Sequence, residues 1–248
     1  MNKFKKIILS IFVLFLSSCN NRDNSEVAPG KLVVGTSADN PPYEFIKDGE
    51  VVGFDIDLAR EIAEEMTREL IIKNLDFPGL LPSVLSNNVD MVISALSITP
   101  ERLNNVDFSM SYGSSEMAVL YLGNTEYKEE DFADKVIGVQ FGTTWEEYAK
   151  KRIENSLKGR VKSLANNLSL VQELLNKNID IVVMEGLQVS KFSKKYKELN
   201  YKIIKDTKTE FAIALPKNSE FTNQVNEILQ KLEKKGAINK LKEKWLNE

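Results

Sequence analysis

Short apolar runs alternate along the chain with longer stretches in which apolar residues recur every three or four positions. The runs are typical of buried strands, and the longer stretches are typical of helices that bury one face. The sequence predicts strands at 31–35, 70–74, 89–93, 117–122, 136–140, 161–164, 179–184, 201–204 and 211–215. It also predicts a hairpin of 43–46 and 51–54, and helices at 55 to about 70, 79–86, 144–155, 168–175 and 186–196, with two more helices at the C-terminus on either side of Gly236.

Strands that alternate with helices of moderate length favour an α/β fold with mostly parallel pairing. The series runs twice, with a polar interval near 111–116, and we therefore expect two lobes. The apolar run at 211–215 could return the chain to the first lobe, and hydrophobic periodicity leaves that question open.

The N-terminus has the layout of a signal peptide over 1–18: three lysines, a short apolar run and small residues. The apolar run is shorter than the roughly 20 residues that span a membrane; the alternative is an uncleaved signal anchor. Leu-Ser-Ser-Cys at 16–19 resembles the bacterial lipobox, which implies a lipid on Cys19, the only cysteine. We expect 19–30 to be a lipidated tether, and the protein to be exported to the periplasm or the membrane surface of the cell envelope.

Removal of 1–18 takes away three basic residues and no acidic ones, which leaves 30 Lys+Arg against 36 Asp+Glu and a formal charge of −6. This balance argues against nucleic acid as a partner. The chain contains no histidine, which excludes a Ser-His-Asp triad and any His-ligated metal site. We expect neither a metal nor a cofactor.

Polar residues follow several predicted strands, at the edge of an α/β sheet where ligands bind. Arg102 lies eight residues after Ser94, and its guanidinium fits a carboxylate through two parallel hydrogen bonds. Ser97 precedes a short helix whose free N–H groups favour an anion, and Thr144 opens a helix in the second half in the same way. The alternatives are a surface arginine and a plain N-cap threonine.

Glu185 follows an apolar strand directly. It is either a surface acid at a strand end or a buried anion that receives an ammonium group. Phe77 and Trp145 also lie after strands, and large aromatic side chains of this kind are more often part of a core than ligand contacts.

Four segments taken together resemble the polar amino-acid branch of the bacterial solute-binding proteins of ABC importers. They are GTSADNPPYEF, VVGFDIDLAREIAEEM, LDFPGLLPSVLSNNVDMVISALSITPERLNNVDFS and GVQFGTTWEEYA. The resemblance covers nearly the whole mature chain. It implies a periplasmic-binding-protein fold of type II: two lobes joined by two hinge strands, with 31–114 plus 211–248 in lobe 1 and 115–210 in lobe 2. It further implies a monomer that delivers a free polar L-amino acid to a membrane permease.

The resemblance also implies roles for individual residues. Arg102 would hold the α-carboxylate, assisted at Ser97 and Thr144. Glu185 would pair with the α-ammonium, assisted by Ser97 and groups near Ser94. Phe77 would cover the ligand side chain.

Four positions depart from the pattern of that family, which usually has Asp in place of Glu185 and an aromatic residue in place of Asn40. Members that take cationic or amide side chains often have an acid in place of Ser37, and Trp145 is larger than the usual residue. These departures leave the side-chain preference undetermined. The alternatives to an importer component are a periplasmic dehydratase of prephenate-like acids on the same fold, and the ligand-sensing subunit of a receptor.

Overall fold

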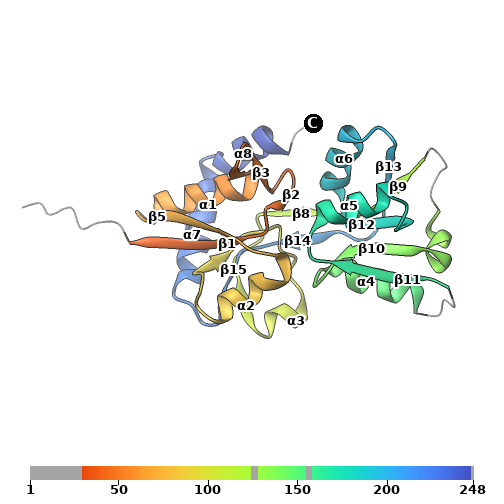
Figure 1. Cartoon of the computed structure of the whole chain (residues 1–248). Coiled ribbons are helices and arrows are strands. Elements are labelled where there is room, and N and C mark those ends of the chain that lie inside the picture. Colours follow the sequence, from red (N-terminus) through yellow and green to blue (C-terminus); the bar gives the residue numbers. More distant parts are fainter. Residues whose placement is uncertain (1–29, 124–127, 155–157, 247–248) are drawn as a thin grey trace, which may run out of the picture.

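The computed structural model describes residues 30–123, 128–154 and 158–246, so the expected signal peptide and Cys19 lie outside the described residues. Two α/β lobes lie side by side (Figure 1). Lobe 1 is built on a sheet of order β5-β1-β6-β15-β7 and lobe 2 on a sheet of order β11-β10-β12-β9-β13. The α/β fold and the two lobes predicted from the sequence are confirmed.

The lobe 1 sheet consists of β5 (Glu69–Asn74), β1 (Lys31–Thr36), β6 (Met91–Val92), β15 (Ala214–Pro216) and β7 (Val106–Phe108). Its faces are covered separately because side chains alternate along each strand. Leu32 and Val34 pack with α1 (Phe54–Glu65), α7 (Phe221–Lys234) and α8 (Ala237–Trp245). Val33 packs on the opposite face with α2 (Leu80–Leu85).

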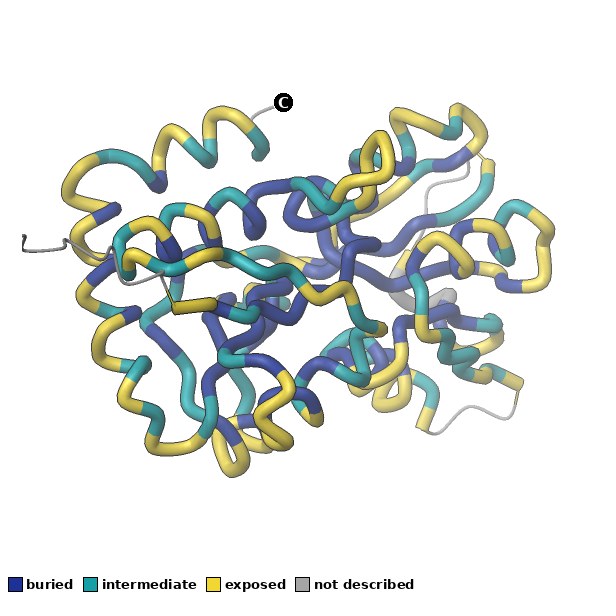
Figure 2. The backbone as a smooth tube through the Cα atoms, turned by 60° about the vertical axis from the view of Figure 1, so that its left-hand side comes forward, coloured by how far each residue is buried: buried dark blue, intermediate teal, exposed yellow. Residues whose placement is uncertain are grey.

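The lobe 2 sheet consists of β11 (Arg160–Leu164), β10 (Val136–Gln140), β12 (Ile181–Glu185), β9 (Met117–Leu122) and β13 (Leu199–Ile203). One face packs against α5 (Asn167–Leu175) and α6 (Gly186–Lys195). The other packs against α4 (Thr144–Ile153) and the 3-10 helix Glu129–Asp134. Figure 2 shows the buried backbone concentrated in these two sheets and in the helix faces against them.

Two short strands cross between the lobes: β8 (Gly113–Ser115) pairs antiparallel with β14 (Thr209–Phe211). They are the two hinge strands that the resemblance implied. The chain leaves β14 and enters the lobe 1 sheet as β15, which answers the question that periodicity left open at 211–215.

The sheets are less parallel than the sequence suggested. In lobe 1, β15 runs antiparallel to both of its neighbours, and in lobe 2 β9 does the same. The cause is the hinge, because β9 and β15 start at the cleft whereas β1, β6, β10 and β12 end there. The remaining strands of each sheet share one direction.

Several elements differ from the predicted ones. The strand expected at 89–93 pairs only at Met91–Val92, and the helix expected from 55 to about 70 ends at Glu65. The short helix expected after Ser97 forms as α3 (Pro100–Leu103). The sequence did not predict β7 or the small strand β2 (Asp39–Asn40), and it did not resolve 211–215 into β14 and β15. These pieces carry too few residues to show a period.

The predicted hairpin forms as β3 (Glu44–Lys47) and β4 (Glu50–Val52), and β2 pairs with β3. Gly53 ends β4 with φ 136°, and a Cβ atom there would lie 2.1 Å from the carbonyl oxygen of Tyr43. Because glycine has no Cβ atom, the backbone of Tyr43 and Glu44 can pack directly against the start of α1, close to the cleft.

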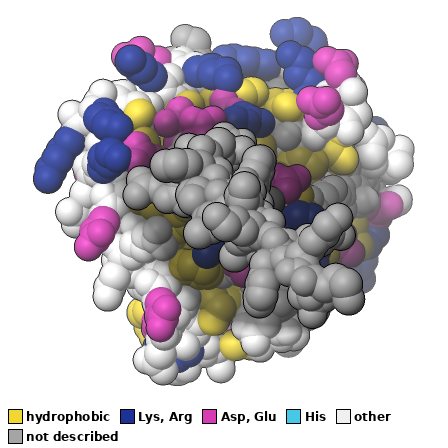
Figure 3. Space-filling model, turned by 90° about the vertical axis from the view of Figure 1, so that its left-hand side faces the viewer, with side chains coloured by type: hydrophobic (Ala, Val, Ile, Leu, Met, Phe, Trp, Pro, Cys, Tyr) yellow, Lys and Arg dark blue, Asp and Glu magenta, His cyan; other side chains and the backbone are white. Residues whose placement is uncertain are grey.

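No helix in the described ranges has the length and apolar content needed to cross a membrane. On the face shown in Figure 3, Lys and Arg side chains lie next to Asp and Glu side chains along the upper edge. The surface charge on this face is thus mixed.

Candidate ligand-binding site

Side chains from both lobes surround a cavity at the carboxyl ends of β1, β6, β10 and β12, which we call the interlobe cavity. It leaves about 20 Å³ of free space, enough for about one water molecule. Side chains must therefore move to admit a larger ligand. The cavity is lined by Asp39, Asn40, Glu44, Phe77, Ser94, Ala95, Ser97, Arg102 and Phe211 from lobe 1 and its hinge strand, and by Gln140, Thr143, Thr144, Trp145 and Glu185 from lobe 2.

Arg102 is buried, with 9% of its surface exposed, so its interpretation as a surface arginine is wrong. It lies in α3, where Thr99 caps the helix by accepting a hydrogen bond from the Arg102 backbone N–H. Its Nη1 donates to the Ser97 carbonyl at 2.7 Å, and its Nη2 donates to the Gly142 carbonyl of lobe 2 at 3.0 Å. Burial lowers the pKa of the guanidinium to about 10, which leaves it charged at neutral pH.

Gly142 presents its carbonyl to Arg102 from a backbone with φ 78°, a conformation that favours glycine. The Gly142 N–H donates to the Glu146 carboxylate at 2.8 Å, which fixes this turn at the start of α4. The N-cap of α4 is Thr143, whose hydroxyl accepts from the Glu146 N–H at 3.3 Å. Thr144 is therefore the first residue of the helix, and its interpretation as the cap is wrong by one position.

Glu185 ends β12 with 2% of its surface exposed, so it is not a surface acid. Its Oε2 caps α6 by accepting from the Gln188 N–H at 2.7 Å. Its Oε1 accepts from the Ser115 hydroxyl of the hinge and, at 3.5 Å, from the Tyr43 hydroxyl of lobe 1. Burial raises the pKa of this carboxyl above its ordinary value.

Each of the two aromatic candidates packs in a lobe core and also lines the interlobe cavity. Phe77 packs on the α2 side of the lobe 1 core, and the Arg102 guanidinium lies 5.7 Å from the centre of its ring. Trp145 packs against both apolar clusters of lobe 2. Both rings also line the interlobe cavity, so packing and ligand contact are compatible for each of them.

Of the smaller polar candidates, Ser94 and Asn40 line the interlobe cavity, whereas Ser37 does not. Ser94 accepts from the Ser37 N–H at 3.1 Å and donates to Glu44 Oε1 at 3.0 Å. Asn40 Nδ2 donates to the same Glu44 oxygen at 3.2 Å. Ser37 lies outside the interlobe cavity and lines a larger neighbouring groove. The structure thus brings together every predicted ligand contact except Ser37.

The sequence analysis missed the buried pair Glu44 and Asp55, whose carboxyls interact electrostatically. Asp55 Oδ2 also accepts from the Ala95 N–H at 2.7 Å and from the Tyr112 hydroxyl at 2.9 Å. Burial raises the pKa of both carboxyls, and the proximity of Asp55 raises that of Glu44 further. The one available signal was an acid inside the apolar run 43–46.

Asp39 was also missed, although it makes the most direct link between the lobes. Its carboxylate accepts from Gln140 Nε2 at 3.1 Å and from the Asn167 backbone N–H at 2.7 Å. Its own carbonyl accepts from Gln188 Nε2 at 3.0 Å. Burial raises the pKa of the Asp39 carboxyl to about 6. No local pattern indicated these partners, because each lies more than 100 residues away.

Two lobes that close around a small charged cavity define a class of proteins that enclose small solutes. Residues 32–248 match the model of the bacterial extracellular solute-binding proteins, family 3. The chain belongs to this family.

Individual relatives agree with the assignment. The chain is 32% identical to the arginine-binding extracellular protein ArtP of Bacillus subtilis (strain 168) over 252 residues, which is 99% of this chain and 98% of that protein. It is 36% identical to a probable histidine-binding protein of Campylobacter jejuni over 194 residues, covering 75% and 74% of the two chains. A solved ancestral arginine-binding protein bound to arginine superposes with a TM-score of 0.84 at 33% identity, covering 88% of this chain and 99% of that one.

Proposed function

We propose that the interlobe cavity binds a free L-amino acid with a cationic side chain, and that the lobes close around it. The protein is the substrate-binding component of an amino-acid ABC importer, and it passes the captured amino acid to the membrane permease. The family and its relatives are binding proteins rather than enzymes.

The charges that line the cavity carry this proposal. Among the described residues that line the cavity, Arg102 is the one basic residue, whereas Asp39, Glu44 and Glu185 are acidic. A zwitterionic ligand pairs its carboxylate with one basic side chain and its ammonium with one acidic side chain. Two of the three acidic side chains in the lining are then left without a partner from the zwitterion. A buried charge needs a partner of opposite sign, and a ligand with an additional positive charge supplies one. Several relatives are named for arginine binding.

Each residue then has a proposed role. Arg102 holds the α-carboxylate, assisted by the backbone at Ser97 and Thr144, and Glu185 holds the α-ammonium. Glu44 receives the side-chain cation, positioned by its hydrogen bonds from Asn40 and Ser94. Phe77 and Trp145 pack against the aliphatic part of the ligand. Since Arg102 and Glu185 belong to different lobes, both ligand charges are paired only when the lobes meet, which shifts the population to the closed form.

The proposal includes the lobe limits and the location. Lobe 1 would comprise 31–114 plus 211–248 and lobe 2 would comprise 115–210, with the break at the pairing of β8 and β14. The protein would be exported as a monomer after removal of 1–18. A lipid on Cys19 would hold it at the membrane surface through the tether 19–30.

A thermal-shift screen against the twenty amino acids tests the ligand class, because a ligand that binds the folded state raises its unfolding temperature by mass action. We expect arginine and lysine to give the largest increases. Increases only with uncharged amino acids would overturn the cationic preference, and no increase with any amino acid would overturn the binding site itself.

A further inference from the structure

The helix cap and first turn of α6, residues 185–188, belong to lobe 2 but contact lobe 1 through three side chains. We call this segment the α6 turn. Glu185 Oε1 accepts from the Tyr43 hydroxyl of lobe 1 at 3.5 Å. Gln188 Nε2 donates to the Asp39 carbonyl of lobe 1 at 3.0 Å. Leu187, which lies between these two polar residues in the sequence, packs against the apolar core of lobe 1. The segment that carries the proposed ammonium site is thus also a place where the lobes meet.

Leu187 makes an apolar contact across the cleft. In the described part of the chain it is the only lobe 2 residue that packs against the lobe 1 core, and it is half-buried there. It faces a cavity of about 280 Å³ whose lobe 1 wall includes Tyr43, Phe54, Tyr112 and Leu246. Leu187 lies outside the lining of the interlobe cavity. It can therefore influence closure without contacting a ligand in that cavity.

The α6 turn is fixed to lobe 2 and to the hinge. Glu185 Oε2 caps the helix by accepting from the Gln188 N–H at 2.7 Å. The Gly186 N–H donates to the carbonyl of Glu116, directly after hinge strand β8, at 2.9 Å. A Cβ atom at Gly186 would lie 3.0 Å from that carbonyl oxygen, so glycine lets the turn lie close against the hinge. Because Leu187 is held by this segment, its contact with lobe 1 depends on how far the lobes rotate.

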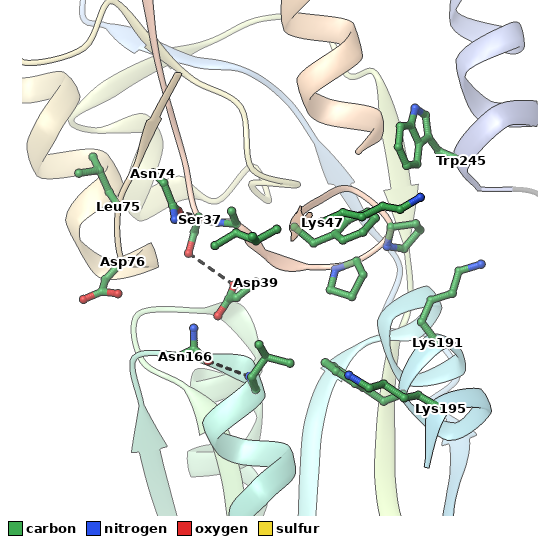
Figure 4. Close-up of a pocket in the computed structure, with 17 residues that line it drawn as sticks. Ser37, Asp39, Lys47, Asn74, Leu75, Asp76, Asn166, Lys191, Lys195 and Trp245 are labelled. Atoms are coloured by element: carbon green, nitrogen blue, oxygen red, sulfur yellow. Dashed lines mark hydrogen bonds between the residues drawn. The ribbon is translucent and has the colours of Figure 1, made fainter. Parts of the chain in front are cut away.

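Beyond its first turn, α6 is separated from lobe 1 by a groove of about 900 Å³. Figure 4 shows Lys191 and Lys195 on the α6 side of this groove, and Lys47 and Trp245 on the lobe 1 side. Asp39 lies where the groove meets the interlobe cavity, since it lines both. The contact between α6 and lobe 1 is therefore concentrated in the α6 turn.

We infer that Leu187 is a positioning residue that sets the equilibrium between the open and the closed form. Burying its side chain against the facing lobe removes apolar surface from water, and this favours the closed form. A ligand that binds the closed form gains apparent affinity when a larger fraction of the protein is closed. Leu187 would thus strengthen ligand binding without touching the ligand. The inference rests on the proposed function for its binding measurement, and a second measurement without ligand separates the two.

The test compares Leu187→Ala with Leu175→Ala in the full-length protein. Leu175 is the last residue of α5, is also half-buried, and packs against the core of lobe 2, so the control makes the same chemical change inside one lobe. We expect Leu187→Ala to raise the Kd for arginine about fivefold, chiefly through faster dissociation, because dissociation requires opening. Small-angle X-ray scattering of the unliganded variant should give a larger radius of gyration. Leu175→Ala should lower the unfolding temperature and leave the Kd and the radius unchanged.

The inference requires both changes in Leu187→Ala and neither in the control. An unchanged Kd would overturn it. A weaker Kd with an unchanged radius would show that Leu187 acts on the site directly, and equal losses of affinity in the two variants would show an effect of stability alone. If the unaltered protein does not bind arginine, the proposed ligand is wrong. The radii of gyration then decide the role of Leu187, because they are measured without a ligand, and equal radii would exclude it.

Discussion

Among the residues that the structure describes, the Arg102 guanidinium donates hydrogen bonds only to carbonyl oxygens, although three carboxyls line the same cavity. The Ser97 and Gly142 carbonyls hold the guanidinium in one orientation without neutralising it, and Glu101 and Glu147 act on it only through their charge. A buried cation that is not hydrogen-bonded to a carboxylate is a strong site for an anion, because burial weakens screening by water. The arrangement thus keeps the guanidinium available for a ligand carboxylate.

We expect Arg102→Ala to weaken arginine binding by at least about 3 kcal/mol, since the ligand carboxylate would remain unpaired in a dry cavity. Isothermal titration calorimetry measures the change in Kd. Arg60→Ala, which alters an exposed arginine of α1, is the control and should bind normally. A loss smaller than threefold for Arg102→Ala would reject its role.

Glu185→Gln should weaken the binding of arginine but spare 5-guanidinopentanoate, which has the same guanidinium and carboxylate without the ammonium. The glutamine side chain keeps an oxygen that can cap α6, so the fold should be retained. Competition assays measure the affinities of the unaltered protein and of the variant for both ligands. Equal losses for the two would show that Glu185 does not contact the ammonium.

The pair of Glu44 and Asp55 predicts that arginine affinity depends on pH. Burial raises the pKa of both carboxyls, and the proximity of Asp55 raises that of Glu44 further. The phenols of Tyr43 and Tyr112 beside them stay neutral. A cation placed beside Glu44 lowers its pKa again, so binding releases a proton and becomes stronger as pH rises. We expect at least about a threefold gain between about pH 5 and about pH 8.

Glu44→Gln is the control for this pH effect, because it removes the titrating group and keeps the hydrogen-bond acceptor for Asn40 and Ser94. Its arginine affinity should be lower and should change less with pH than that of the unaltered protein. The change that remains belongs to Asp39, whose pKa of about 6 lies in the same range. Calorimetry in two buffers of different ionisation enthalpy would measure the released proton directly. A flat pH profile in the unaltered protein would contradict the prediction.

At the scale of elements, the site is assembled by strand ends and helix starts that belong to different parts of the chain. β2 supplies Asp39, β10 supplies Gln140, and the start of α5 supplies Asn167. Asp39 connects these elements across the cleft and is held by three donor groups there. The carboxylate therefore contributes to closure rather than to the stability of one lobe.

Asp39→Asn should favour the open form and reduce arginine affinity about tenfold, because hydrogen bonds to a charged group contribute about 1.5–3 kcal/mol each. Small-angle X-ray scattering would show a larger radius of gyration in the absence of ligand. Asp76→Asn is the matched control, since its exposed carboxylate lies at the same groove and makes none of these bonds. Equal scattering from both variants would exclude Asp39 as the link.

The whole molecule has separate apolar cores in its two lobes. The lobes are joined by β8 and β14, which form a short two-stranded sheet. Leu187 of α6 in lobe 2 packs against the lobe 1 core, but the buried residues of each cluster otherwise come from one side of the cleft, so rotation would cost little apolar contact. The free energy of closure then comes from this contact, from polar contacts in the cleft and from the ligand.

Cys19→Ser tests the expected membrane attachment of the whole protein. If the lipobox assignment is right, the variant should leave the membrane fraction and become soluble, because a serine at this position does not accept the lipid. Arginine affinity should not change, since the site lies entirely within 39–211. Unchanged membrane fractionation would show that the assignment is wrong.

The sequence by itself determined the elements with a clear hydrophobic period. The run 31–35 became β1, and the apolar stripe of Val225, Ile228, Leu229 and Leu232 became the buried face of α7. It also indicated Glu185, directly after a buried strand, and Arg102, in the polar stretch that follows the predicted strand 89–93, since polar residues after a buried strand lie at the edge where ligands bind. These features are local, because propensity and periodicity depend on neighbours within a few residues.

Only the tertiary structure decided which lobe receives β15, which strands run against their neighbours, and which polar groups meet in the cleft. Asp39 reaches Asn167 across 128 positions, and Tyr43 reaches Glu185 across 142. Glu44 lies in the predicted hairpin and Asp55 at the start of a predicted helix, where nothing in the sequence showed that packing would bury both. The partner of a polar side chain is set by how distant segments cross, and no pattern of neighbouring residues contains that information.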